Sequence, residues 1–409
     1  MNILQINTGD IGGGAETVAS DIQKQLLLSG HDCHLVVKRK SNDGNNVISL
    51  NYYLPEIAFF MGLEKILGLD NVLYFRQRML KRIIKENKID IVHLHNVHGY
   101  YFSLFNFPLV LKDIPIVWTL HDTWAFTGKC VYTYDCKRYQ TTCGECKRLK
   151  EYPRMLWDNT RFMQSLKRKM YAKANKIVFV TPSRWLKEIA ERSNILRDHR
   201  IEHIPNGVDT STFYLQNKQD LRKKYKIPLD TKAILFIAND VNEKRKGFRY
   251  LINALERLDH KEEYTLLSIG RKQLDTKIKS NFKVVEFAHV KKDSELAELY
   301  NVVDLFVIPS IEENFPCVVN EAMACGVPVV GFDTGGIPEQ IEDGVRGFCA
   351  RKGDDIDLAN KINLFFNLPD SYRKEMSQNC HGHIINNLTV KHCVDKYITL
   401  YDDILSETA

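Results

Sequence analysis

Short apolar runs alternate with longer mixed segments along the whole chain. Apolar runs that end at turn residues are typical of strands buried on both faces of a parallel sheet. The runs that we interpret as strands are 2–7, 89–94, 114–120, 177–180, 201–204, 233–238, 265–270, 284–287, 304–309 and 327–332. Amphipathic segments between them predict helices, so the expected fold class is α/β with parallel sheets. Because 409 residues exceed one ordinary core, we expect two doubly wound domains.

One stretch, residues 304–347, carries two acidic side chains at a spacing that suits a binding site. Glu313 precedes a helix predicted over 317–325, and Glu321 lies inside that helix. This places both carboxylates near the carboxyl ends of parallel strands, where open α/β proteins bind ligands. A carboxylate accepts hydrogen bonds from neighbouring hydroxyls, so the pair suits the two sugars of a nucleotide sugar. The alternative is that Glu313 only favours the helix dipole and Glu321 lies on a solvated face.

The residues around these acids resemble the signature of the retaining GT-B glycosyltransferases of family 4. In that signature, two acids separated by seven residues precede A-M-A-x-G-x-P-V and then T-G-G-x-x-E. The matching residues here are Glu313, Glu321, Ala322 to Val329 and Thr334 to Glu339. The resemblance implies two Rossmann-like domains facing across a cleft. It also implies transfer of a sugar from a nucleotide diphosphate sugar (UDP- or GDP-) with retention at the anomeric carbon.

The resemblance assigns donor-binding roles to residues of the second half. Glu313 and the backbone of Asn314, Phe315 and Pro316 would hold the donor sugar, and Glu321 would bind the ribose. Gly270-Arg271 and the backbone of 287–289 would flank the base.

The leaving diphosphate needs cations, and the loop 239–247 supplies them. Lys246, with Arg245, would stabilise the charge that develops on the diphosphate. The family usually has Gly-Arg directly after the strand 233–238, whereas this chain has Asn239-Asp240, so Arg245 is the expected substitute. The alternative is a solvated basic turn.

The first half contributes a glycine loop and a histidine. Gly13 and Gly14 lie in a glycine run between a strand and a helix, where backbone N–H groups can approach an anion. In the family this loop lies over the donor diphosphate and the acceptor. His121 follows the strand 114–120 and resembles the family's histidine that contacts the transferred sugar, although a strand-end histidine is often structural. With Glu313 and Lys246 it completes our candidate catalytic set.

Other histidines follow the strand 89–94. His95, Asn96 and His98 are weaker candidates for the acceptor side, and His93 is expected to point into the core or the opposite face.

Four cysteines, Cys130, Cys136, Cys143 and Cys146, fall within a polar loop. Thiolates so close together suit a tetrahedral structural zinc, which would organise the loop without taking part in chemistry. A disulfide or redox pair and unlinked thiols are the alternatives. The resemblance implies no catalytic metal, and the oxygen-rich cluster of a magnesium site is not evident.

Charge is distributed unevenly. Residues 1–200 hold 30 Lys and Arg against 19 Asp and Glu, although the whole chain carries only +6. No nucleic-acid-binding motif accompanies the basic half, so an anionic membrane surface is the expected partner, contacted by a basic amphipathic helix over 59–88. A helix packed on its own domain is the alternative. No apolar run is long enough to span a membrane and no signal peptide is evident, so we expect a cytoplasmic protein, peripheral on the membrane's inner face.

The predicted domains are 1–209 on the acceptor side, with the cysteine loop 130–146, and 210–385 for the nucleotide sugar. A final helix in 386–409 is expected to cross back to the first domain, and only helices are expected after Gly347.

The variant Glu-Asn-Phe-Pro and the stretch His121 to Gly128 are similar to enzymes that build bacterial surface polysaccharides such as capsule, exopolysaccharide or O-antigen. The acceptor would then be a hydroxyl of a glycan, free or linked to a polyprenyl diphosphate. The alternatives are a nucleotide-sugar hydrolase or epimerase, a non-catalytic nucleotide-sugar-binding scaffold, and a zinc or redox module built on the cysteines.

Overall fold

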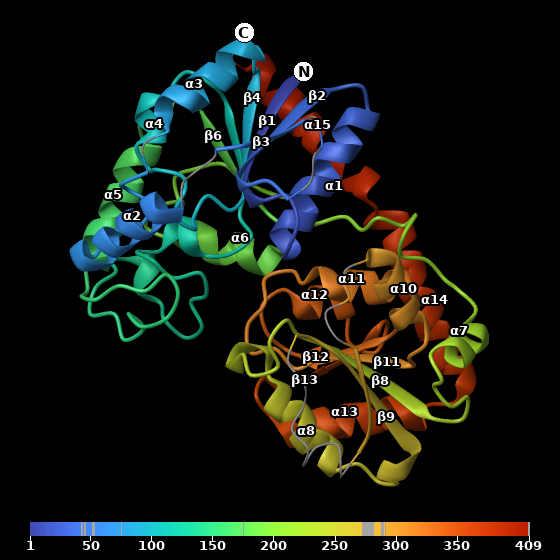
Figure 1. Ribbon diagram of the computed structural model, residues 1–409. Coiled ribbons are helices and arrows are strands. Elements are labelled where there is room, and N and C mark those ends of the chain that lie inside the picture. Colours follow the sequence, from blue (N-terminus) through green and yellow to red (C-terminus); the bar gives the residue numbers. More distant parts are fainter. Residues whose placement is uncertain are drawn as a thin grey trace. The chain divides into compact units, whose positions relative to one another are not determined.

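The computed structural model describes residues 1–41, 44, 46–50, 54–74, 76–174, 176–271, 282–287, 290 and 292–407. Contacts divide the chain into two compact units, here called unit 1 and unit 2. Unit 1 is Met1–Pro205 with Cys393–Ala409, and unit 2 is Asn206–His392. Each unit is a parallel sheet with helices, which confirms the predicted fold class (Figure 1).

Unit 1 is built on a seven-stranded parallel sheet. Its strands are β1 (Asn2–Gly9), β2 (Asp32–Arg39), β3 (Val47–Ser49), β4 (Ile91–Leu94), β5 (Ile116–Thr119), β6 (Ile177–Thr181) and β7 (Ile201–His203). Its helices are α1 (Gly14–Leu28), α2 (Leu54–Leu67), α3 (Gln77–Glu86), α4 (Asn106–Leu109), α5 (Thr160–Tyr171) and α6 (Arg184–Glu191), with the short 3-10 helices η1 (Trp124–Phe126) and η2 (Arg138–Gln140).

The strand order of unit 1 is β3-β2-β1-β4-β5-β6-β7, so the order reverses between β1 and β4. Alternate residues of β1 and β2 face opposite sides of the sheet. Leu4 and Val36 belong to the large core under α3, α4 and α5, whereas Leu35 packs with Ala19 of α1 on the other face. Figure 1 shows the same two layers, with α1 and α15 on one side and α3, α4 and α5 on the other.

Unit 2 repeats the design with a six-stranded parallel sheet. Its strands are β8 (Lys232–Ile237), β9 (Tyr264–Ile269), β10 (Lys283–Phe287), β11 (Leu305–Ile308), β12 (Val329–Phe332) and β13 (Gly347–Ala350). Its helices are α7 (Lys218–Lys224), α8 (Phe248–Glu256), α10 (Asp293–Asn301), α11 (Cys317–Ala324), α12 (Ile337–Ile341), α13 (Asp355–Asn367) and α14 (Asp370–Asn387), with the 3-10 helices η3 (Lys244–Lys246) and η4 (Lys261–Glu263); α15 (Val390–Ser406) ends the chain.

In unit 2 the order is β10-β9-β8-β11-β12-β13, with the reversal between β8 and β11. The strands are buried on both faces, because Ile234 and Phe236 join one core while Leu235 joins the other. This double burial explains why the strands read as continuous apolar runs in the sequence.

Two predictions about local structure are wrong. The single basic helix expected over 59–88 is two helices, because the buried carboxylate of Glu64 accepts hydrogen bonds from the backbone of Asn71, Val72 and Leu73 and turns the chain. The segment after residue 347 contains β13, which pairs with β12. Its sequence, Gly-Phe-Cys-Ala, lacks the β-branched residues that indicate a strand.

The units divide after Pro205 and after His392, whereas the sequence suggested 209 and 385. Val208 forms a β-bridge with Thr389, and its N–H donates to the carbonyl of Leu388 at 2.8 Å. This pairing explains why residues 206–209 and 386–392 belong to unit 2.

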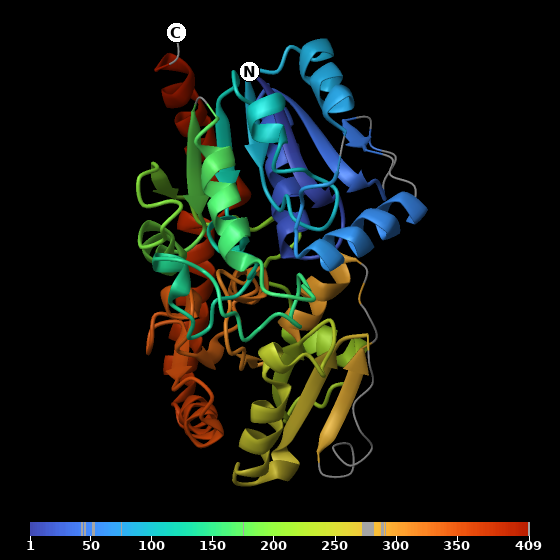
Figure 2. The ribbon, with the colours of Figure 1, turned by 90° about the vertical axis from the view of Figure 1, so that its left-hand side faces the viewer.

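Helix α15 belongs to unit 1 from Cys393 onward. The Tyr397 hydroxyl lies 2.6 Å from Thr119 Oγ1, and the Tyr401 hydroxyl lies 2.7 Å from His93 Nδ1, so two buried tyrosines fasten the helix to the sheet. Both views show α15 running along the strands (Figures 1 and 2). His93 therefore points to the face opposite the main core of unit 1, as expected.

We predict that Tyr401→Phe lowers the free energy of unfolding by about 1–3 kcal/mol, because the buried ring nitrogen of His93 loses its partner. Chemical denaturation measures the change. Tyr372→Phe is the matched control, since Tyr372 is 60% exposed on α14. Equal stabilities of the two variants would contradict the role given to Tyr401.

Candidate functional site

The first group of candidate residues lies where two loops of unit 2 leave the sheet. The loop after β8 carries Arg245 and Lys246, and the loop after β11 carries Glu313. These two strands flank the reversal of strand order, which is where doubly wound sheets bind ligands. The N–H of Ile311 donates to the carbonyl of Arg245 at 2.7 Å, so the loops are held together by their backbones.

Two glycines make this close packing possible. Gly247 has φ +72°, and a Cβ there would lie 1.7 Å from the carbonyl oxygen of Pro309. Gly335 has φ +58°, and a Cβ there would lie 1.7 Å from the carbonyl oxygen of Glu313. Any other residue would push the loop away and strain the backbone. The Lys-Gly and Thr-Gly-Gly motifs are thus backbone requirements of the loop that presents Glu313.

The Glu313 carboxylate is buried between two cations. Its Oε1 lies 2.6 Å from a guanidinium nitrogen of Arg245 and 2.7 Å from Lys246 Nζ. Burial raises the pKa of Glu313, but Lys246 and Arg245 outweigh burial and hold the pKa below its ordinary value. The carboxylate is therefore ionised at neutral pH, and the three predicted residues form one cluster. Arg245 also contacts Glu243 and the carbonyl of Glu312.

Glu321 lies apart from this cluster, on α11. Its Oε2 accepts a hydrogen bond from the Tyr300 hydroxyl at 3.0 Å, which fixes the carboxylate against α10. Asn314 and Phe315 are each 8% exposed, and Pro316 caps the N-terminus of α11. Of the predicted base-flanking residues, 288 and 289 lie outside the described residues.

The glycine loop of unit 1 is already occupied by a carboxylate of the chain. The N–H of Gly13 donates to Glu16 Oε2 at 3.1 Å, and Gly14 begins α1. Glu16 thus takes the position at the helix N-terminus where an anion would bind. A diphosphate at Gly13 would have to displace it.

His121 is part of a chain of neutral side chains. His95 Nδ1 lies 3.0 Å from His121 Nε2, and His95 Nε2 lies 2.8 Å from the Gln5 amide. In the orientation of the Gln5 amide that hydrogen-bonds the carbonyl of Ala19 and the N–H of Gln23, its nitrogen donates to His95 Nε2. His95 therefore carries its hydrogen on Nδ1 and donates it to His121 Nε2. Burial lowers the pKa of His121 to about 4. At neutral pH, His121 is therefore a neutral imidazole whose own hydrogen is on Nδ1.

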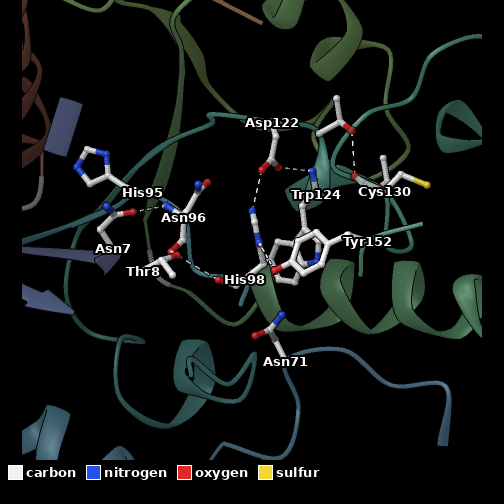
Figure 3. Close-up of polar contacts among 12 residues, drawn as sticks. Asn7, Thr8, Asn71, His95, Asn96, His98, Asp122, Trp124, Cys130 and Tyr152 are labelled. Atoms are coloured by element: carbon white, nitrogen blue, oxygen red, sulfur yellow. Dashed lines mark hydrogen bonds and ion pairs between the residues drawn. The ribbon is translucent and has the colours of Figure 1, made fainter. Parts of the chain in front are cut away.

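The second group of polar residues in unit 1 is the pair of His98, which the sequence made only a weaker candidate, and Asp122. His98 Nε2 lies 2.7 Å from Asp122 Oδ2, and His98 Nδ1 lies 3.3 Å from the Tyr152 hydroxyl (Figure 3). Burial lowers the pKa of His98, but Asp122 outweighs burial and raises it, so the pair holds a proton. The adjacent acid in His121-Asp122 was the available signal, but no spacing links Asp122 to His98 or Tyr152.

A hollow lies between the loops that follow β4 and β5. It has a volume of about 10 Å³, which is room for about one water molecule, and its lining includes His95, Asn96, His98, His121 and Asp122. The residues predicted from the two strand ends therefore meet at one place in unit 1. Its polar lining is one ion pair, two neutral imidazoles and an amide, which can hold one hydroxyl-sized group, and the rest of its lining is apolar or aromatic.

The cysteine loop is held together without a four-thiolate centre. Across the part of the chain that the structure describes, no three His, Cys, Asp or Glu side chains are grouped as metal ligands. Cys130 and Cys146 are hydrogen-bonded to each other, which raises the pKa of Cys130 and lowers the pKa of Cys146 to about 6. Cys143 accepts a hydrogen bond from the N–H of Gly128, and Cys136 is exposed. The structural zinc stays a prediction that this arrangement does not support.

A buried lysine also holds this loop together. Lys129 is 1% exposed, and its ammonium donates to the carbonyls of Arg148, Leu149 and Glu151 at 2.7–3.2 Å. The ten cysteines all lie within the described residues and all are free thiols.

Comparison with known proteins identifies the family. The model described as Glycosyltransferase Family 4 matches residues 12–212, and the model described as Glycosyl transferases group 1 matches residues 217–382. The chain belongs to the family 4 glycosyltransferases. Together the two models cover both units, and the second one contains Glu313, Glu321, Lys246 and the glycines that support them.

Relatives and solved structures agree with this assignment. The chain is 27% identical over 351 residues to WcaC of Escherichia coli K12, a glycosyl transferase assigned to colanic acid biosynthesis, covering 81% of this chain and 82% of the relative. The fold of this chain matches that of sucrose-phosphate synthase of Thermosynechococcus elongatus with a TM-score of 0.73, 16% identity and full coverage of both chains. It also matches Anabaena HepE, solved with UDP-glucose, with a TM-score of 0.62, 17% identity and coverage of 98% and 99%. These likenesses show the GT-B glycosyltransferase fold.

The described helices of this glycosyltransferase include none whose length and apolar composition would let it cross a membrane.

We predict that Glu313→Gln lowers the free energy of unfolding by about 3 kcal/mol at pH 7, because Lys246 loses the counter-ion it contacts and Arg245 loses one of its two. The folded-state pKa of Glu313 lies below the ordinary value of 4.5, so its contribution is present above pH 4.5 and is lost as pH falls through the folded pKa. The difference between wild type and variant, measured by denaturation at several pH values, should therefore shrink below pH 4.5.

The control for this experiment is Glu375→Gln, since Glu375 is an exposed carboxylate of α14. A difference for Glu313→Gln that stays constant through the acidic range would mean that the carboxylate is not the stabilising charge.

Proposed function

We propose that this glycosyltransferase retains the anomeric configuration while it moves a hexose from a nucleotide diphosphate sugar to a hydroxyl of a glycan acceptor. The expected donor is a UDP- or GDP-sugar, and the expected setting is the biosynthesis of a bacterial surface polysaccharide. The observation that carries the proposal is the buried Glu313 carboxylate between Lys246 and Arg245 at the reversal of strand order in unit 2.

The charges of this cluster suit a diphosphate donor. Lys246 and Arg245 both contact Glu313, and Arg245 also contacts Glu243, so an incoming diphosphate would compete with these carboxylates for the two cations. Lys246 is the more exposed of the two side chains, 22% against 10% for Arg245, and is the natural first contact for the diphosphate. In the transition state the leaving diphosphate gains negative charge. Preorganised cations therefore stabilise the transition state more than they stabilise the bound donor.

Once the cations bind the diphosphate, Glu313 is left to accept hydrogen bonds from hydroxyls of the transferred sugar. Glu321, held by Tyr300, is suited to accept both ribose hydroxyls, because a carboxylate has two oxygens.

The proposal gives unit 1 the acceptor side. His121, neutral and with its hydrogen on Nδ1, would donate to a sugar hydroxyl. His98 and Asp122, in the same hollow, would orient acceptor hydroxyls. The similarity to WcaC supports a polysaccharide acceptor, and the complex of HepE with UDP-glucose supports a UDP-sugar donor. A glycan on a polyprenyl diphosphate is the acceptor class that we propose.

The donor is tested by thermal shift with UDP-, GDP- and ADP-sugars. A donor at a hundred times its dissociation constant should stabilise wild type by about 2.7 kcal/mol. We predict a shift with one nucleotide class that is lost in Glu321→Ala, because the ribose contact is removed.

Glu375→Ala, an exposed carboxylate on the same unit, should shift like wild type. No shift with any donor, or an unchanged shift in Glu321→Ala, would contradict the donor site. Release of free sugar without any acceptor would indicate a hydrolase instead.

Catalysis by the cations is tested with Lys246→Met, which removes the charge and keeps most of the volume. We predict that kcat falls about 100-fold, since one preorganised charge next to a leaving group contributes on this scale. KM should change far less. The anomeric NMR signal of the wild-type product should show the donor's configuration.

The matched control is Lys244→Met, because Lys244 lies in the same short helix but is exposed. Equal kcat values for the two variants would remove Lys246 from the catalytic set.

A further inference from the structure

Large apolar side chains are exposed together at one place in unit 1. They are Phe59, Ile66 and Leu67 of α2 and Leu156 and Trp157 of the segment before α5, here called the apolar face. Their exposed fractions are 67%, 60%, 41%, 73% and 61%, respectively. Contiguous apolar groups of this size on a protein surface mark an interaction site.

The two segments of the apolar face are bonded to each other. The N–H of Leu156 donates to the carbonyl of Lys65 at 3.4 Å, and the Asn159 amide donates to the carbonyl of Leu67 at 3.4 Å. The indole of Trp157 packs on Gly68, where even a Cβ would come within 2.7 Å of the ring. The apolar residues therefore form one surface and not two separate patches.

The orientation of α2 is set from its inner side. Glu64 is fully buried and binds three backbone N–H groups of residues 71–73, and the ring of Phe60 packs on Tyr74 at 6.0 Å. Phe59 and Ile66 are seven residues apart, which places them on one stripe of the helix. Because Glu64 holds the opposite stripe of α2 in the core, the stripe with Phe59 and Ile66 points outward.

The segment that carries Leu156 and Trp157 is basic. Between Lys147 and Lys169 the chain has eight Lys or Arg, of which only Lys167 is buried, and two acids, Glu151 and Asp158. Asp158 is engaged by the backbone of Cys146 and Thr160. Arg154 and Arg161, both exposed, flank Leu156 and Trp157 in the sequence. Apolar and aromatic residues bordered by cations match the interface of a bilayer that contains anionic lipid.

The apolar face adjoins the acceptor-side hollow. Tyr152, four residues before Leu156, contacts His98, and Asp70, three residues after Leu67, accepts a hydrogen bond from Trp124 Nε1. Both segments of the face thus continue directly into the walls around His98 and Asp122. By contrast, the basic helix α3 lies at the other end of the sheet from α2 in both views (Figures 1 and 2).

From these observations we infer that the apolar face docks unit 1 on the surface of an anionic lipid bilayer. The inference rests on the proposed function for its purpose, because a polyprenyl-linked acceptor is held in such a bilayer. Leu156 and Trp157 enter the interface, and the surrounding Lys and Arg side chains bind lipid phosphates. Docking there brings the hollow with His98 and Asp122 to the membrane surface.

The test is sedimentation of the full chain with vesicles of phosphatidylcholine alone or mixed with phosphatidylglycerol. Wild type should bind the mixed vesicles, and high salt should weaken binding because the charges are screened. The double variant Leu156→Ser, Trp157→Ser should bind at least about tenfold more weakly, since two exposed apolar side chains no longer enter the bilayer. The replaced side chains are largely exposed, so the melting temperature should fall only by the small loss of the Trp157 contact with Gly68.

Tyr372→Ser is the matched control, because it removes an aromatic side chain that is 60% exposed in unit 2, and it should bind like wild type. Equal vesicle binding by the double variant and wild type, or no binding by wild type, would overturn the inference. A wild-type dimer that the double variant converts to a monomer without vesicles would overturn it too, since the face would then join two copies.

Vesicle binding requires neither donor nor acceptor, so its failure is separate from failure of the proposed function. Transfer to an acceptor without a lipid chain should be the same in the double variant and in wild type.

Discussion

The buried charge of Glu313 constrains the site of unit 2 more than any other interaction. An ionised carboxylate is costly to bury unless cations and hydrogen bonds compensate it, and here Arg245 and Lys246 provide that compensation. Both cations come from the loop after the neighbouring strand, so the loops after β8 and β11 must lie in contact. Gly247 and Gly335 allow this contact, because only glycine fits beside the carbonyls of Pro309 and Glu313. The sequence motifs of this region follow from one electrostatic requirement.

Unit 1 compensates its buried polar groups differently. His93, His95 and His121 stay neutral because burial lowers their pKa values, and each finds a hydrogen-bond partner on a neighbouring element. Beside them, His98 and Asp122 form an ion pair. This hollow can hold a hydroxyl without strong net charge, whereas the site of unit 2 holds two cations beside Glu313. The contrast agrees with a division between a sugar acceptor and a diphosphate donor.

In the long loop after η1, buried cations hold backbone carbonyls together. Lys129 donates to three backbone carbonyls, and Lys167 binds the carbonyls of Trp124 and Thr127 beneath the indole of Trp124. Four nearby cysteines made zinc the simplest interpretation of the sequence. Spacing alone does not reveal where each thiol points, and two of the four are directed to each other while a third meets a backbone N–H.

The sequence by itself determined the fold class, most of the strands and the cluster of Glu313, Lys246 and Arg245, because parallel strands buried on both faces and glycine-dependent loops leave strong local patterns. It missed β2, β3 and β13, and the residues of β13 have no β-branched side chain. It also merged α2 with α3, because the bend depends on the carboxylate of Glu64 reaching forward to residues 71–73. Only the tertiary structure decided that His98 meets Asp122 and Tyr152 and that Trp157 packs on Gly68. These contacts join residues 24 to 89 positions apart, and the position of a side chain in space at such separations depends on packing that no local pattern records.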